Sequence, residues 1–218
     1  MSDSTDPDPR SPVTKPAVRA RLLAARAALT PDVKRDADAA VRDALVDLIR
    51  SVQPRTVAAF APLADEPGGR DLASALLTAV ETLPTAGRLL LPVLLPDLDV
   101  DWAVWAGEPL VPAGRGLREP TGQRLGTAAI GGADLVVVPA LAVDRSGIRL
   151  GRGGGSYDRA LPRVAPSALV VVPLYDGELV DRLPSEPHDR RVTGVVLPGG
   201  YVDLRRQGGS GGPVVRRE

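Results

Sequence analysis

Apolar residues recur at helical spacing in two N-terminal segments of the sequence, 16–29 and about 31–52. Thr30 and Pro31 stand between the two segments, where a threonine caps a helix and a proline fits its first turn. The apolar positions are Val18, Leu22, Leu23, Ala25 and Leu29 in the first segment, and Val33, Ala37, Val41, Leu45 and Leu48 in the second. The pattern predicts two amphipathic helices that pack against another layer.

Beyond these segments the pattern changes to short apolar runs that predict strands. Runs that end in proline, DLVVVP at 134–139 and ALVVVP at 168–173, are typical of parallel strands covered on both faces. The other predicted elements are strands at 56–60, 88–92, 100–105 and 192–197, and a helix at 72–83. Together they predict a three-layer α/β/α domain with a mostly parallel sheet. Ligand sites in such sheets lie at the carboxyl ends of strands, here the loops after Phe60, Pro139 and Pro173.

Length and composition fit one domain with a tail at each end. A chain of 218 residues matches a single domain at about 100–200 residues per domain. Residues 1–14 contain almost no apolar side chains, and 205–218 are rich in arginine and glycine, so we expect both tails to be disordered. The predicted α/β domain therefore spans 15–204.

Charge and cysteine content exclude several classes of protein. Twenty-seven basic side chains balance 27 acidic ones, so no net field attracts nucleic acid or an anionic membrane. Without cysteine there is no disulfide framework or thiolate nucleophile, and one histidine cannot build a multi-histidine metal site. The apolar runs are shorter than the ~20 residues that span a bilayer, and the acidic N-terminus is unlike a signal peptide. We expect a cytoplasmic protein with no nucleic-acid or membrane partner.

The densest chemical signal is a glycine-rich segment, DRSGIRLGRGGGSYDR at 144–159, which leads into a predicted helix near Ser156. Glycines allow successive N–H groups to converge in a concave nest that binds anions, above all phosphate. Arg149 and Arg152 add fixed positive charge, and Ser156 is placed to cap the helix. The segment matches neither the Walker nor the dinucleotide-binding pattern. The alternative is a flexible Gly/Arg linker, against which the Tyr-Asp pair and the preceding strand argue.

Other candidate residues are weaker when taken singly. The acidic pair at 65–66 follows a predicted strand, but acids in loops are most often only solvated. His188 precedes Asp189 and equally fits a helix cap or a surface position. Lys15 and Arg19 are four residues apart on one helical face, as on any solvated stripe.

Together these pieces resemble the 5-formyltetrahydrofolate cyclo-ligase family, also called methenyltetrahydrofolate synthetases, over about residues 15–198. The most specific part, GIRLGRGGGSYDR at 147–159, is similar to the family's G-x-R-L-G-x-G-x-G-Tyr-Tyr-Asp signature. In chain order, the resemblance also includes the Lys-x-x-x-Arg start at Lys15, the acid Glu66, the Glu-Pro pair at 119–120 and the P-x-E-x-H-Asp stretch at 184–189.

The resemblance implies an enzyme that uses ATP and Mg²⁺ to cyclise 5-formyltetrahydrofolate to 5,10-methenyltetrahydrofolate, with release of ADP and phosphate. It also implies the fold shared with certain sugar-phosphate isomerases and CoA transferases. By this resemblance the catalytic residues are Arg149, Arg152 and Tyr157, and the magnesium ligands are Asp158 and Asp189. The implied ATP-binding residues are Lys15, Arg19, Arg149, Leu150, Gly151, Arg152, Gly153, Gly154, Gly155, Ser156 and Tyr157. The implied folate-binding residues are Ala61, Glu66, Arg152, Gly153, Gly154, Gly155 and Ser156.

The implied chemistry needs no covalent nucleophile. Transfer of a phosphoryl group to the formyl oxygen creates a phosphorylated intermediate that N10 can attack. Phosphoryl transfer is catalysed by positioning and charge neutralisation, which an N–H nest, arginines and a metal ion supply. The lack of cysteine and of a histidine cluster is therefore no obstacle.

Two positions depart from the family's pattern. Ser156 stands where the family has the first tyrosine of Tyr-Tyr-Asp, and it lacks the ring. Glu178 stands where the family frequently has glutamine.

Two alternative functions stay open. One is a nucleotide-sensing module without turnover, and the serine at position 156 favours it. The other is an enzyme of the same fold that handles a sugar phosphate or CoA. That second function would leave Lys15, Arg19 and Asp189 without a role. We expect a monomer.

Overall fold

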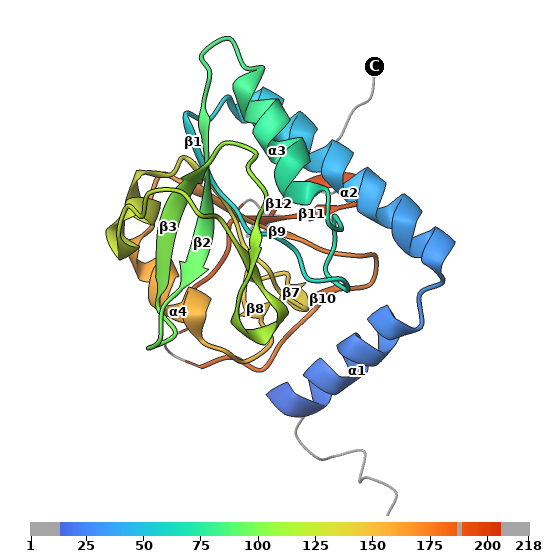
Figure 1. Cartoon of the computed structure of the whole chain (residues 1–218). Helices are drawn as coiled ribbons and strands as arrows, with labels where there is room; N and C mark the ends of the chain where they lie inside the picture. The colour runs from blue at the N-terminus through green and yellow to red at the C-terminus, as the bar shows by residue number, and fades with distance from the viewer. Residues whose placement is uncertain (1–13, 187–188, 206–218) are drawn as a thin grey trace, which may run out of the picture.

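Seven strands form the central sheet of the computed structural model, which describes residues 14–186 and 189–205 (Figure 1). Their order across the sheet is β12-β11-β9-β6-β1-β2-β3. The five inner strands pair in parallel, and the edge strands β3 and β12 run antiparallel to their neighbours. The strands are β1 (Thr56–Ala58), β2 (Arg88–Leu94), β3 (Val100–Trp105), β6 (Leu135–Val137), β9 (Leu169–Pro173), β11 (Gly194–Leu197) and β12 (Gly200–Asp203). The predicted mostly parallel sheet is confirmed, whereas β12 was not predicted.

Helices cover both faces of the sheet. The long helices α2 (Pro31–Val52) and α3 (Leu72–Glu81) lie side by side over one face (Figure 1). The other face is covered by short helical segments, α4 (Ser156–Ala160), η2 (Thr127–Gly132) and η3 (Leu161–Arg163). The predicted α/β/α layering is confirmed.

Side chains of the inner strands point alternately to the two faces of the central sheet, so each strand contributes to the hydrophobic core on both faces. Val57 of β1 packs towards α2 and α3, and the next residue, Ala58, packs towards η2 and α4. Leu135 and Val136 of β6 divide in the same way, because successive strand residues point to opposite faces. Burial of each such valine or leucine stabilises the fold by about 1.5–3 kcal/mol. This accounts for the continuous apolar runs seen in the sequence.

The first helix, α1 (Lys15–Ala27), packs on a separate three-stranded sheet instead of the central one. This small sheet contains β7 (Ala142–Asp144), β8 (Arg149–Leu150) and β10 (Leu179–Val180). Val18 and Leu22 of α1 are buried against Leu141, Ile148 and Leu150. The packing places the start of α1 beside the glycine-rich segment. A further hairpin consists of β4 (Val111–Pro112) and β5 (Arg118–Glu119), joined through η1 (Gly114–Gly116).

The predicted disordered tails, 1–14 and 205–218, fall almost wholly outside the described residues and stay predictions. At the boundaries, the Thr14 side chain accepts a hydrogen bond from the N–H of Ala17 and caps α1, and Arg205 pairs with Asp203. Among the helices that the structure describes, none has the length and apolar character needed to cross a membrane.

Candidate active site

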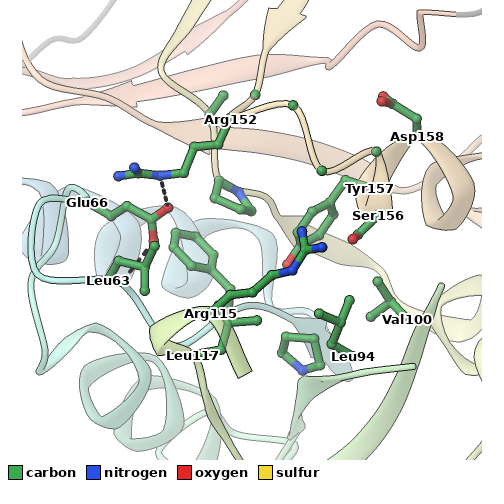
Figure 2. A pocket seen from close by; sticks show the side chains of 18 of the residues that line it. Leu63, Glu66, Leu94, Val100, Arg115, Leu117, Arg152, Ser156, Tyr157 and Asp158 are labelled. Atoms are coloured by element: carbon green, nitrogen blue, oxygen red, sulfur yellow. Dashed lines mark hydrogen bonds and ion pairs between the residues drawn. The ribbon is translucent and has the colours of Figure 1, made fainter. Parts of the chain in front are cut away.

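A pocket of about 340 Å³ opens at the carboxyl ends of the central parallel strands (Figure 2). Two of the three predicted loops line it, those after Phe60 and Pro139. Every residue that the sequence analysis assigned to ATP, folate, magnesium or catalysis also lines this pocket. The sequence reasoning missed most of the other lining residues, chiefly the apolar wall formed by Phe60, Leu63, Pro92, Leu94, Val100 and Leu117. Single apolar side chains at strand ends and in loops carry no signal that could have identified them.

The glycine-rich loop needs glycine at two points. Gly153 and Gly155 have φ values of 99° and 75°, in the left-handed region that residues with a Cβ rarely adopt. Helix α4 begins directly after the second of these turns, so that Gly155 occupies the cap position and no side chain caps the helix. The prediction that Ser156 caps the helix is therefore wrong, because Ser156 is already the first residue within it.

Helix α1 contributes two basic side chains to the pocket. The Nε of Arg19 donates a hydrogen bond to the carbonyl oxygen of Gly151 at 2.9 Å, which ties the helix to the glycine-rich loop. The Nζ of Lys15 lies 3.1 Å from Oδ2 of Asp189 and 3.4 Å from Oε2 of Glu186. The Lys-x-x-x-Arg spacing therefore places both cations on the side of α1 that faces the loop.

Arg149 in β8 and Tyr157 in α4 flank the glycine-rich loop and line the pocket. The Arg149 side chain is buried, forms an ion pair with Asp158 and donates to the carbonyl oxygen of Arg190 at 3.1 Å. Within the described residues, the buried hydroxyl of Tyr157 has no hydrogen-bond partner. Burial raises the pKa of Tyr157 above its ordinary value, and the nearby Glu66 carboxylate adds to this rise. The hydroxyl is therefore protonated at neutral pH and available to a ligand as a donor.

The pKa values of two neighbouring carboxyl groups, Asp65 and Glu66, shift in opposite directions because only Glu66 is deeply buried. Burial raises the pKa of Glu66 above its ordinary value, although Oε2 accepts a hydrogen bond from the N–H of Leu63 at 2.8 Å. For Asp65, burial also acts to raise the pKa, but the hydrogen bond and charge of Arg152 outweigh it and lower the pKa. Arg152 thus bridges the two acids, at 2.5 Å to Asp65 and 3.4 Å to Glu66.

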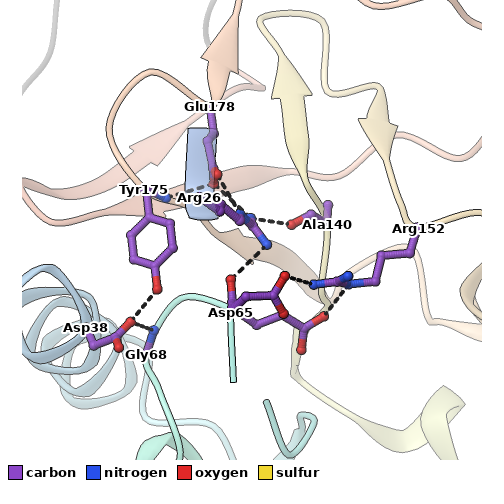
Figure 3. Close-up of polar contacts among 9 residues, drawn as sticks. Arg26, Asp38, Asp65, Gly68, Ala140, Arg152, Tyr175 and Glu178 are labelled. Atoms are coloured by element: carbon purple, nitrogen blue, oxygen red, sulfur yellow. Dashed lines mark hydrogen bonds and ion pairs between the residues drawn. The ribbon is translucent and has the colours of Figure 1, made fainter. Parts of the chain in front are cut away.

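A buried ion pair behind the pocket fixes the position of α1 (Figure 3). Arg26 donates to the two carboxylate oxygens of Glu178 at 2.6 and 2.8 Å, to the carbonyl of Ala140 at 2.8 Å and to that of Asp65 at 3.4 Å. Helix α1 is thereby joined to both loops that line the pocket. In the sequence Glu178 was only a departure from the family's pattern, and no spacing indicates a partner 152 positions away.

The loop after Pro173, the third that the sequence singled out, acts through this network. The N–H of Tyr175 donates to Glu178 at 2.9 Å, and its hydroxyl donates to Asp38 of α2 at 2.7 Å. Asp38 also accepts from the N–H of Gly68 at 3.0 Å. The loop that carries Glu66 is therefore held from two sides, by α1 and by α2 (Figure 3).

The two expected magnesium ligands lie in the same pocket. Asp158 pairs with Arg149 and Asp189 with Lys15, and the described residues contain no group of three acids or histidines that could hold a metal alone. Mg²⁺ is usually held by one or two carboxylates, with phosphate oxygens and water completing its shell. Two carboxylates beside the glycine-rich loop fit that arrangement. His188 lies outside the described residues.

Comparisons with known proteins agree with this geometry. The family model for 5-formyltetrahydrofolate cyclo-ligases matches residues 12–198. The 5-formyltetrahydrofolate cyclo-ligase of Mycolicibacterium smegmatis is 41% identical over 201 residues, which cover 89% of this chain and all of that protein. The mitochondrial cyclo-ligase of Arabidopsis thaliana is 37% identical over 81 residues, 33% of this chain and 29% of that protein.

Two solved structures of methenyltetrahydrofolate synthetases are also similar to this chain. The 5,10-methenyltetrahydrofolate synthetase of Aquifex aeolicus has a TM-score of 0.73 and 26% identity, with 94% of this chain and 97% of that chain covered. The synthetase of Mycoplasma pneumoniae, at 19% identity, shares the fold with a TM-score of 0.65, over 84% of this chain and 98% of that chain. From the family match over nearly the whole described domain and the full-length bacterial relative, the chain belongs to the 5-formyltetrahydrofolate cyclo-ligase family.

Proposed function

We propose that this chain catalyses the ATP- and Mg²⁺-dependent cyclisation of 5-formyltetrahydrofolate to 5,10-methenyltetrahydrofolate, as a cytoplasmic monomer. The observation that carries the proposal is the convergence of Lys15, Arg19, Glu66 and the 149–158 segment on one pocket. These residues come from separate parts of the chain, and the family's chemistry needs all of them at one place. No nucleic-acid or membrane partner is required.

The reaction proceeds through phosphorylation of the formyl group. The formyl oxygen attacks the γ-phosphorus of ATP, a P–O bond forms, and the bond to the leaving oxygen of ADP breaks. N10 then attacks the formyl carbon, the C–O bond to the phosphoryl group breaks, and inorganic phosphate leaves as N10 loses its proton. Phosphate is a far better leaving group than an amide oxygen, so phosphoryl transfer from ATP drives ring closure.

The phosphate side of the pocket consists of α1 and the glycine-rich loop. Lys15 and Arg19 face the loop, where they neutralise the triphosphate, and the N–H groups of Gly151–Gly155 contact its oxygens. Arg149, held rigidly by its carbonyl contact, stabilises charge on the transferred group. Asp158 and Asp189 would hold Mg²⁺, which supplies charge neutralisation at the phosphates. ATP binding then replaces the pairs that these aspartates form with Arg149 and Lys15.

The folate side of the pocket includes Ala61, Glu66 and Arg152, together with the apolar wall. The Glu66 carboxyl is held by the N–H of Leu63 and has one oxygen directed at Arg152, so it is positioned to accept a hydrogen bond from the folate ring. Tyr157 lines the same pocket, and its buried hydroxyl, which has no hydrogen-bond partner among the described residues, can donate to the reacting groups. The apolar wall excludes water, which would otherwise hydrolyse the phosphorylated intermediate.

An absorbance assay tests this proposal. Purified protein, 5-formyltetrahydrofolate, ATP and Mg²⁺ should produce the absorbance of methenyltetrahydrofolate, and omission of ATP or Mg²⁺ should abolish it. A nucleotide sensor would bind ATP without any absorbance change. An enzyme for sugar phosphates or CoA would leave the folate unchanged and bind its own substrate. No product from folded protein with all components present would reject the proposal.

A further inference from the structure

A turn at the rim of the pocket holds Arg115 in an unfavourable backbone conformation. Arg115 lies in η1 between two glycines, with φ 61° and ψ 24°. The left-handed region costs a residue with a Cβ roughly 1–2 kcal/mol, whereas glycine adopts it freely. A third glycine would therefore suit this turn better. The presence of arginine indicates that its side chain has a task that offsets the strain.

The Arg115 side chain extends into the pocket. Figure 2 shows it reaching from the turn towards Ser156 and Tyr157. Within residues 14–186 and 189–205, its guanidinium forms no hydrogen bond or ion pair. The other basic side chains that line the pocket all donate a hydrogen bond, namely Lys15, Arg19, Arg118, Arg149 and Arg152. Among the described residues that line the pocket, Arg115 is thus the cation that a ligand can engage without displacing another contact.

The position of the guanidinium relative to the glycine-rich loop indicates which ligand it meets. A Cβ placed on Gly154 would lie 3.9 Å from Nη1 of Arg115 and 3.9 Å from Oγ of Ser156. A Cβ on the preceding residue, Gly153, would instead lie 3.6 Å from Cζ of Arg19. The two arginines therefore approach successive residues of the loop, with Arg19 on the side of α1. Figure 2 shows Arg115 on the same side of the pocket as Leu94, Val100 and Leu117, three residues of the apolar wall.

We propose that Arg115 is a folate-binding residue whose guanidinium plane stacks on the flat part of the pteridine ring, in the space beside Ser156. This proposal rests on the proposed function of the pocket. A guanidinium is planar, permanently charged and weakly hydrated, and it stacks readily on conjugated rings. Ser156 has no ring to offer at this point, where the family's pattern has a tyrosine. Arg115 supplies the planar surface that covers the substrate there.

Substitutions that separate planarity from charge test this role. Arg115→Lys keeps the charge and loses the plane, Arg115→Phe keeps a plane without charge, and both share the backbone cost of the native arginine. We expect the lysine variant to raise the Kd and KM for 5-formyltetrahydrofolate about fivefold to tenfold, and the phenylalanine variant to stay within about threefold of the wild type. The KM for ATP should stay unchanged in both. Calorimetry measures the Kd without turnover.

Arg115→Gly distinguishes this role from a structural one. It should weaken folate binding as the lysine variant does, while the Tm stays equal to or above that of the wild type, because the backbone strain is relieved. Gln53→Gly is the matched control. It relieves the same kind of strain at the end of α2, where φ is 51°, and should leave folate binding unchanged.

Three results would overturn the proposal: wild-type folate affinity in Arg115→Lys, a change confined to the KM for ATP, or a Tm loss in Arg115→Gly with unchanged folate binding. A wild-type protein that binds folate but does not cyclise it would reject the proposed function and leave the Arg115 measurements valid. A wild-type protein that binds no folate would reject both.

Discussion

Replacement of Arg26 by methionine should lower the free energy of unfolding by about 3–5 kcal/mol, the usual cost when one partner of a buried ion pair is removed. Arg26 donates three hydrogen bonds of 2.6 to 2.8 Å, two of them to Glu178, which is only 5% exposed. Methionine would fill much of the volume but leave the Glu178 carboxylate and the Ala140 carbonyl without this donor. Because a domain is stable by only about 5–15 kcal/mol in total, the loss should be large.

Urea unfolding followed by the fluorescence of Trp102 and Trp105 measures this effect. For a chain of this length the loss corresponds to a Tm lower by roughly 6–20 °C. The double variant Arg26→Met/Glu178→Met should be clearly more stable than the sum of the single effects predicts, since it leaves no buried charge unpaired. Arg50→Met is the control, because its pair with Asp47 is exposed and should contribute less than about 1 kcal/mol. A cost below about 1 kcal/mol for Arg26→Met, or strict additivity in the double variant, would refute the reasoning.

Arg149→Ala and Asp158→Ala should each lower kcat by more than about 100-fold, as when a group that stabilises the transition state is lost. Near-normal turnover in folded variants would show the loop to be only structural. Arg152→Lys should raise the KM of either substrate or lower kcat, because an ammonium group cannot bridge Asp65 and Glu66 as a guanidinium does. Unchanged steady-state constants would contradict this. Burial raises the pKa of Glu66, so the Glu66 carboxyl holds its proton more tightly in the folded protein than in the unfolded one. The folded protein therefore loses stability as pH rises from about the ordinary pKa of 4.5 through the raised pKa. Glu66→Gln should therefore gain Tm relative to the wild type over that range, and parallel Tm profiles would argue against it.

The sequence predicted the parts of the fold that depend on local pattern. The strands at 134–139 and 168–173 are apolar on both faces because helices cover both sides of the central sheet, and burial of that kind is visible as a continuous run. The cap at Thr30 and the proline after it mark the start of α2 for equally local reasons. The glycine-rich loop was found because its backbone needs residues without a Cβ.

What the sequence did not reveal depends on contacts between distant residues. The small sheet under α1 is built from strands of two or three residues, too short to show an alternating pattern. The partner of Arg26 lies 152 positions away and was recognisable only once the chain was folded. Arg115 resembles any other arginine of an arginine-rich sequence until its backbone angles and its place in the pocket are known.

The most direct test of the account is to follow the formyl oxygen. In a reaction with 5-formyltetrahydrofolate labelled with ¹⁸O in the formyl group, each methenyltetrahydrofolate formed should deliver one labelled oxygen to inorganic phosphate, as mass spectrometry of the phosphate would show. This result follows if the pocket transfers the γ-phosphoryl group of ATP to that oxygen before ring closure. Product formation with the label in water and unlabelled phosphate would contradict it.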